Sequence, residues 1–172
     1  MPIQIRKERP GDEKSVFEVN SCAFGRDAEP KVVDQLRINC PEGISLVAEV
    51  DRKIVGHILF TPAWIETEQK TVHGMGLAPL AVAPECQRMG VGTALIQAGI
   101  EELRAADTPF IVVLGHPGYY PKFGFEKGSK YGFRSAYDEV PDEAFMLLVF
   151  QPEAIQGIRG TIKIRPEFTA AM

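Results

Sequence analysis

The strongest constraint on the fold of this chain is a short segment with two glycines, Gln87–Leu95, which reads QRMGVGTAL. An apolar, strand-like segment precedes it, and a long helical pattern follows it from about Gly90 to Ala106. Glycines one residue apart at a helix start leave backbone N–H groups uncovered by side chains, and a helix N-terminus carries roughly half a positive charge. We therefore expect a strand–loop–helix unit that binds a phosphate or pyrophosphate group.

The composition of the 172-residue chain limits the partners of this loop. Apolar residues make up 45% and charged residues 24%, as in ordinary globular domains. The net charge of −4 gives no basic footprint for nucleic acid, and no basic amphipathic face or long apolar span points to a membrane. The isolated Cys22, Cys40 and Cys86 form no metal-binding pair, so we expect no metal. Because Met1–Arg6 carries no apolar signal core, we expect a cytoplasmic protein.

The spacing of apolar residues predicts an alternation of strands and helices around a mixed sheet, without a domain boundary. The expected helices cover residues 12–24, 29–38 and 90–106. The expected strands cover residues 3–6, 45–50, 54–61, 64–67, 71–83, 110–114, 123–126, 145–150 and 161–165. We therefore expect a single domain of the α/β or α+β class that spans residues 1–172.

The glycine segment lacks two common nucleotide-binding patterns. The P-loop string GxxxxGK[ST] occurs nowhere in the chain. A dinucleotide fingerprint requires a third glycine, but Leu95 occupies that position after Gly90 and Gly92. The pattern that matches is Q/R-x-x-G-x-G/A between a strand and an amphipathic helix, which resembles the acetyl-CoA-binding signature of the GNAT acetyltransferase superfamily.

Segments on both sides of the loop extend this resemblance. Upstream, Leu77–Glu85 (LAPLAVAPE) is similar to the GNAT strand that precedes the pyrophosphate loop. Downstream, Leu114–Phe125 (LGHPGYYPKFGF) resembles the tyrosine segment of the LGxPxYYxxFGF group. The resemblance covers residues 3–150 and leaves residues 151–172 as a C-terminal extension. It implies a GNAT fold with about six to seven strands, about four helices and two splayed parallel strands at the cofactor site.

The resemblance implies acetyl-CoA as a co-substrate. The pantetheine arm is expected on backbone groups of the upstream strand, by the chemistry of strand addition, and the pyrophosphate on amides of the loop. His116 is expected either to reach the cofactor or to cap the local turn. The expected cofactor-binding residues are Leu80, Ala81, Val82, Gln87, Arg88, Met89, Gly90, Val91, Gly92, Thr93 and His116.

The resemblance also implies the reaction, in which a primary amine attacks the acetyl thioester directly in a ternary complex. The backbone N–H of Val82 is expected to polarise the acetyl carbonyl. Tyr120, four residues before Gly124, is the expected catalytic residue that protonates the departing CoA thiolate. Tyr119 is the alternative, because Pro121 disfavours helical geometry at the residue before it.

The expected general base is undecided. Many members of the family carry a carboxylate on the strand before the loop, at the position that Gly76 occupies here. His73 lies close by but on the opposite face of a regular strand. His57 and Glu49 are further candidates, each also consistent with a structural role, and an ordered water or an acceptor that arrives deprotonated serves equally well.

The acceptor is expected to be a primary amine on a small molecule, peptide or protein. By resemblance, residues 23–30 and the loop 128–143 contact it, although the latter also suits a solvated surface loop. A homodimer is an expectation from the family alone. Two other functions remain open: a catalytically silent module that binds or senses acyl-CoA, and a transferase that uses a longer acyl-CoA or an acyl carrier protein as donor.

Overall fold

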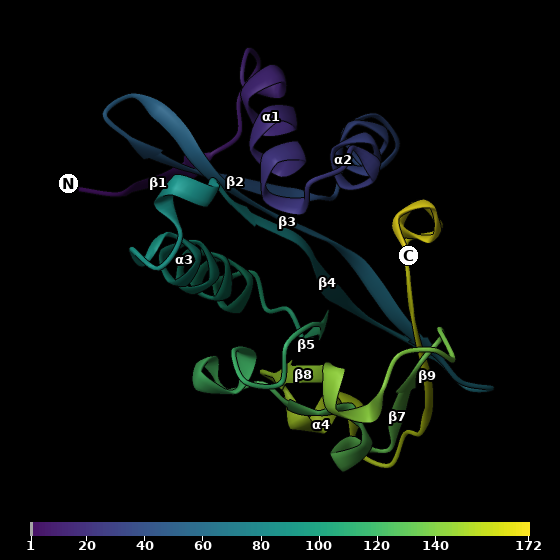
Figure 1. The fold of residues 1–172 in the computed structure, drawn as a ribbon. Helices are drawn as coiled ribbons and strands as arrows, with labels where there is room; N and C mark the ends of the chain where they lie inside the picture. Colours follow the sequence, from purple (N-terminus) through teal and green to yellow (C-terminus); the bar gives the residue numbers. More distant parts are fainter. Residues whose placement is uncertain (1) are drawn as a thin grey trace. The chain divides into compact units, whose positions relative to one another are not determined.

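The structure is a computed structural model that describes residues 2–172, and the chain forms two compact units (Figure 1). Unit 1 comprises residues 1–60, 78–102 and 166–172, and unit 2 comprises residues 61–77 and 103–165. Two long strands, β3 (Lys53–Glu66) and β4 (Thr71–Val82), contribute residues to both units. The C-terminal extension is divided between the units, because its last seven residues belong to unit 1.

Unit 1 holds four strand segments and three α-helices. Strand β2 (Ile44–Val50) pairs antiparallel with β1 (Gln4–Lys7) on one side and with β3 on the other. Asp51 and Arg52 join β2 to β3 with φ angles of 51° and 66°, the left-handed pair that a tight hairpin turn requires. The remaining elements are α1 (Glu13–Phe24), α2 (Ala28–Asn39), the end of β4, the 3-10 turn η1 (Pro84–Cys86), most of α3 (Val91–Ala105) and the 3-10 segment η5 (Pro166–Ala171).

Helix α3 packs closely on β3 because each of the two elements has a glycine at a point of contact. A Cβ atom on Gly99 would lie 2.3 Å from the ring of Phe60, and a Cβ atom on Gly56 would lie 2.7 Å from Val91 Cγ1. The first contact lies in the middle of the helix and the second at its first residue. The small residues therefore fix how near the helix, and the loop that precedes it, lie to the strand.

Unit 2 contains five further strands and the remaining parts of β3 and β4. Strand β5 (Phe110–Leu114) pairs parallel with β4 over Met75–Leu77 and antiparallel with β8 (Phe145–Val149). Strand β8 also pairs with β6 (Glu126–Lys127), and β9 (Gly160–Ile164) pairs antiparallel with β3 and parallel with β7 (Phe133–Ser135). The helical segments are η2 (Tyr120–Phe123), η3 (Gly128–Tyr131), η4 (Asp142–Ala144) and α4 (Pro152–Ile155).

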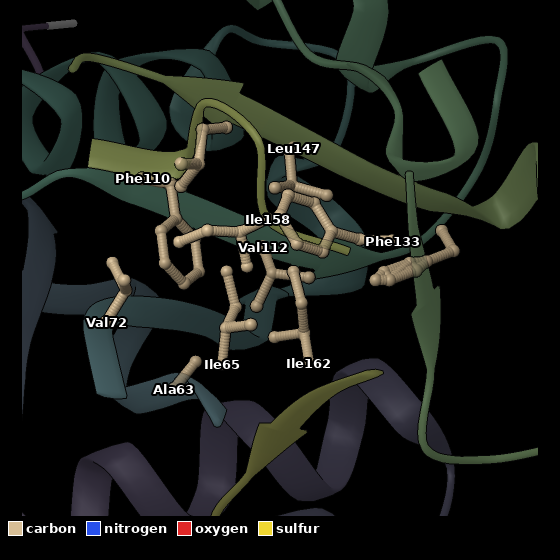
Figure 2. Packing of buried hydrophobic residues seen from close by; sticks show 11 residues of the cluster. Ala63, Ile65, Val72, Phe110, Val112, Phe133, Leu147, Ile158 and Ile162 are labelled. Atoms are coloured by element: carbon tan, nitrogen blue, oxygen red, sulfur yellow. The ribbon is translucent and has the colours of Figure 1, made fainter. Parts of the chain in front are cut away.

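The core of unit 2 gathers apolar side chains from several strands, as Figure 2 shows. Phe110 and Leu147 are fully buried, and Ile65 and Ile162 contribute to the same cluster. The ring of Phe110 lies against Gly74, where a Cβ atom would come within 2.6 Å of it. The continuous apolar run of β5 is therefore buried, as its sequence predicts.

The expected fold class is confirmed, because the sheet contains both parallel and antiparallel pairs. Within residues 2–172 it has nine strands, more than the six to seven that the resemblance implies. A separate strand at residues 64–67 is wrong, since β3 runs through Pro62 without a break. Pro62 lies after the β2 pairing, which ends at Phe60, and before the β9 pairing, which begins at Ala63, so its missing N–H interrupts neither ladder.

The expected strand at residues 123–126 is also wrong. Tyr120–Phe123 forms a 3-10 turn, which Gly124 ends with a φ of 99°, and only Glu126–Lys127 is extended. The prediction missed β7, α4 and η5, which are all short. The three longer expected helices are confirmed to within two residues at each end.

Candidate active site

The glycine segment of unit 1 begins with a tight turn after β4. In η1, Cys86 N donates to Ala83 O at 2.8 Å, and Gln87 N donates to Pro84 O at 3.4 Å. Residues 87–90 are exposed, and Val91 is the first residue of α3. The segment therefore forms an open loop at a helix N-terminus, as the sequence predicts.

Two residues of this loop have left-handed backbone conformations, Arg88 with a φ of 63° and Gly90 with a φ of 88°. A Cβ atom on Gly90 would meet no atom within 4 Å, so this glycine is needed for its backbone conformation and not for packing. At Arg88 the same conformation costs about 1–2 kcal/mol. Backbone strain of this kind, when it is observed in an exposed loop, points to a functional role.

The first N–H groups of α3 have no acceptor within the helix. Ala94 N donates to Gly90 O at 3.0 Å, so the N–H groups of Val91, Gly92 and Thr93 precede the first bond of the helix. Successive amides after left-handed residues form a concave site for an anion. The loop therefore fits a ligand that carries phosphate groups.

The end of β4 lies beside this loop in unit 1. Leu80 and Val82 are half-buried, and Ala81 is buried. Gln87 Nε2 donates to Val82 O at 3.2 Å, a contact between loop and strand that the sequence pattern does not predict. The structure thus brings together ten of the eleven residues expected to bind the cofactor, namely 80–82 and 87–93.

In unit 2, Tyr120 is the first residue of the short turn η2 and is only 8% exposed. Its ring lies over Gly115, where a Cβ atom would be 2.3 Å from Tyr120 Cε2. The ring also packs edge-on against Phe125, with 5.6 Å between the two ring centres. Burial, together with the neighbouring Tyr119, raises the pKa of the Tyr120 hydroxyl well above its usual value. Across residues 2–172 the hydroxyl has no hydrogen-bond partner, so it is a protonated donor without an acceptor in the protein.

Tyr119 and His116 lie in the same segment in different surroundings. Tyr119 is half-buried, and Lys122 Nζ lies 4.1 Å from the centre of its ring. His116 is exposed, and its backbone carbonyl accepts from Tyr119 N at 3.1 Å and from Tyr120 N at 3.4 Å. The backbone of His116, and not its ring, therefore closes the turn before η2.

His73 and Glu49, two candidates for the general base, differ in their surroundings. His73 is exposed on β4, whereas Gly74 and Gly76 are buried. Glu49 Oε1 accepts from Arg6 Nε at 2.7 Å, so this carboxylate takes part in an ion pair.

The third candidate, His57, is fully buried in unit 1, and burial, assisted by the charge of Arg37, lowers its pKa to about 3. Asn20 Nδ2, which also donates to Val16 O, lies 3.0 Å from His57 Nδ1, and Ser45 Oγ lies 2.9 Å from His57 Nε2. The imidazole is therefore neutral and carries its proton on Nε2.

Ser45, His57 and Asn20 have the residue types of a nucleophilic triad, but their hydrogen bonds run in the opposite direction. His57 Nε2–H donates to Ser45 Oγ, and Ser45 Oγ donates in turn to Glu8 Oε2 at 2.5 Å. A serine that gives its proton to a carboxylate and accepts from the imidazole is not activated by that imidazole. This hydrogen-bonded group is structural, and the burial of its imidazole excludes His57 as the base.

The two segments expected to contact the acceptor lie in different units. In the turn between α1 and α2, Arg26 Nε donates to Glu29 Oε1 at 2.9 Å and Arg26 Nη2 to Ala171 O at 2.7 Å, so η5 holds the turn. In the 128–143 loop, Tyr131 OH donates to Glu126 Oε1 at 2.9 Å. No cluster of metal-ligating side chains occurs within residues 2–172, and no helix in that range has the length and apolarity to cross a membrane.

Known proteins resemble this chain in sequence and structure. The sequence profile described as "Acetyltransferase (GNAT) domain" matches residues 4–128. The uncharacterised N-acetyltransferase YjhQ of Escherichia coli K12 is 39% identical over 168 residues, which is 94% of this chain and 92% of YjhQ.

Two solved structures superpose on most of the chain. The GNAT family N-acetyltransferase YhbS from Escherichia coli, solved in complex with CoA, has a TM-score of 0.88 at 27% identity, over 97% of this chain and 92% of that protein. A GNAT family acetyltransferase from Brucella melitensis, solved in complex with acetyl-CoA, has a TM-score of 0.76 at 34% identity, over 97% and 98%. The strand–loop–helix unit thus occurs in a chain that belongs, by its sequence and its fold, to the GNAT acetyltransferase family.

Proposed function

We propose that this protein is an acetyl-CoA-dependent N-acetyltransferase that transfers an acetyl group to a primary amine by direct attack in a ternary complex. The observation that carries the proposal is the left-handed, amide-exposing loop at the start of α3, in a chain of the GNAT family. Two relatives, solved with CoA and with acetyl-CoA, support the choice of donor.

The proposed cofactor contacts follow from the geometry of unit 1. The amides of residues 88–93 bind the pyrophosphate, because they precede the first hydrogen bond of α3 and are open on the loop side. The backbone of Leu80, Ala81 and Val82 pairs with the pantetheine arm. Met89, which is 57% exposed, lies on the same loop and offers an apolar surface to the nucleotide.

The proposed chemistry needs a polarised carbonyl and a protonated leaving group. The N–H of Val82 donates to the acetyl oxygen as this oxygen gains charge. Tyr120 donates its proton to the departing thiolate, and its protonated, unpartnered hydroxyl supports this role. General acid assistance of this kind is typically worth about 10²–10⁴ in rate.

In this proposal the acceptor amine loses its proton to an ordered water or arrives already deprotonated. His57 is neutral and buried, Glu49 is paired with Arg6, and Gly76 has no side chain to accept a proton. A rate that rises with pH until the acceptor amine itself is neutral is the expected consequence.

We further propose that the protein works in a reducing compartment such as the cytoplasm, because Cys22 and Cys86 are free thiols. Homodimerisation stays a prediction, which light scattering measures directly.

The test combines binding with turnover. Calorimetry should detect binding of acetyl-CoA, and mass spectrometry of a panel of amines and peptides should identify an acetylated product. The absence of a carboxylate at Gly76 favours one second candidate, a module that binds acyl-CoA without catalysis. Tight binding without release of CoA thiol across the whole panel would select that candidate, and no binding at millimolar ligand would exclude both.

A further inference from the structure

One hydrogen bond in unit 1 joins the two parts of the proposed cofactor site. Gln87 Nε2, on the exposed loop, donates to the carbonyl oxygen of Val82 at the end of β4 at 3.2 Å. Within residues 2–172 it is the one hydrogen bond that a side chain of residues 87–93 makes. The loop is otherwise tied to the strand end through the backbone turn of η1.

The peptide group that Gln87 contacts is held from its other side as well. The carbonyl of Val82 and the N–H of Ala83 belong to the same peptide, and Ala83 N donates to Val55 O on β3 at 2.8 Å. With both polar groups engaged, the plane of this peptide is fixed between β3 and the loop. Because this peptide follows the last residue of β4, the orientation of the end of the strand is fixed as well.

We propose that Gln87 is a positioning residue, whose side-chain amide couples the strand that binds pantetheine to the loop that binds pyrophosphate. The inference rests on the proposed function, since it concerns the same site. CoA spans both parts, so a fixed spacing between them lowers the entropy that binding must overcome. A ligand that occupies the loop alone gains nothing from this spacing.

The exposure of the Gln87 side chain and the independent support of the loop backbone favour a coupling role for Gln87 and not a packing role. Its side chain lies at the surface, where it fills no cavity. The nearby loop backbone is held independently, because Cys86 N donates to Ala83 O and Gln87 N to Pro84 O. Loss of the side-chain amide therefore leaves the loop formed and removes its link to Val82.

Two ligands separate this role from the alternatives: intact CoA, and 3′-phosphoadenosine 5′-diphosphate, which carries only the phosphates and the nucleotide. The test variant is Gln87→Met, which keeps the length of the side chain and removes the donor. The matched control is Gln97→Met, at an exposed position of α3 whose side chain makes no hydrogen bond within residues 2–172. Gln87→Arg, which keeps an N–H donor, is the rescue variant.

We expect Gln87→Met to lower the affinity for CoA by about two- to tenfold, which is the range of one hydrogen bond. Its affinity for the nucleotide fragment should be unchanged. The ratio of the two affinities should return to the wild-type value in Gln87→Arg and stay there in Gln97→Met. An equal loss for both ligands would overturn the coupling role, since it would mean that Gln87 binds phosphate or folds the loop. An unchanged CoA affinity would overturn it too.

A second measurement needs no ligand. Amide hydrogen exchange of Ala83 should be faster in Gln87→Met than in wild type and Gln97→Met, because the peptide loses one of its two anchors. Equal exchange in all three proteins would contradict the inference. A wild-type protein that binds neither ligand would overturn the proposed function, whereas wild-type binding with no effect of Gln87→Met would overturn this inference alone.

Discussion

Gly56 lies directly beneath Val91, the first residue of α3, so closely that a Cβ atom on Gly56 would come within 2.7 Å of Val91 Cγ1. The same Cβ atom would lie 3.0 Å from Leu95 Cδ1 and 3.3 Å from Ala81 O. A single small residue on β3 therefore sets the position of both the helix N-terminus and the strand end in unit 1.

Gly56→Ala should push the start of α3 away from β3. Overpacking typically costs about 1–3 kcal/mol, which corresponds to a fall in Tm of very roughly 2–12 °C for a chain of this size. We also expect weaker binding of CoA. Calorimetric scanning and titration measure both effects.

Gly76→Ala is the matched control for this variant. A Cβ atom there would have its nearest neighbours at 3.6–3.8 Å, which is ordinary contact distance. It should leave the Tm nearly unchanged. If Gly56→Ala is equally well tolerated, close approach at Gly56 does not fix the helix.

Arg88 should reveal its backbone strain when two neutral variants are compared. Arg88→Ala and Arg88→Gly remove the same charge, but only glycine adopts the φ of 63° without strain. The glycine variant should be more stable by about 1 kcal/mol, measured by chemical unfolding. An alanine variant that matches or exceeds it would show that the left-handed conformation is not retained.

Tyr120→Phe should lower turnover by about 10²-fold or less and leave CoA affinity nearly unchanged. Phenylalanine keeps the ring packing on Gly115 and Phe125, so stability should be preserved. Steady-state kinetics with the amine identified in the screen provide the measurement, and Tyr119→Phe is the comparison. Equal turnover of Tyr120→Phe and wild type across a pH series would remove this hydroxyl from the chemistry.

His57 should make the protein less stable in acid. The pKa of His57 is about 3 in the folded protein and 6.5 in the unfolded chain. Below pH 6.5 the unfolded chain therefore binds a proton that the folded protein does not bind. The contribution of His57 to the free energy of unfolding is complete above pH 6.5 and is lost as the pH falls toward 3. Between pH 7 and pH 5 this single group accounts for about 2 kcal/mol. Urea unfolding of wild type and His57→Gln at both pH values isolates it, since the carboxylates titrate in both proteins. A decrease of equal size in the two proteins would mean that His57 is accessible to protons in the folded state.

The sequence predicted the elements with strong local signals and missed those that depend on distant partners. The glycine loop, α3 and β5 carry a periodic or continuous apolar pattern, so their positions were readable. Strand β7 has three residues, too few to show a period of two, and it is extended because β9 pairs with it. The expected strand at residues 123–126 rested on Phe123 and Phe125, which alternate with Gly124 and Glu126, whereas Gly124 ends the preceding turn in a left-handed conformation.

The same distinction applies to the candidate site. The positions of the strand and the loop in the fold were predictable because they form one continuous motif. The contact between Gln87 and Val82, the close approach at Gly56 and the neutral state of His57 depend on residues that folding brings together. His57 shows this most clearly, because Asn20, 37 residues away in sequence, fixes its tautomer.

The most direct test of the central claim is a calorimetric titration of wild type and Gly92→Val with acetyl-CoA. We expect wild type to bind, and Gly92→Val to lose binding because a branched side chain would occupy the space where the phosphate approaches the start of α3. Circular dichroism of the variant confirms that it is folded. Absence of binding to wild type at millimolar acetyl-CoA, or equal binding by a folded Gly92→Val, would contradict the account.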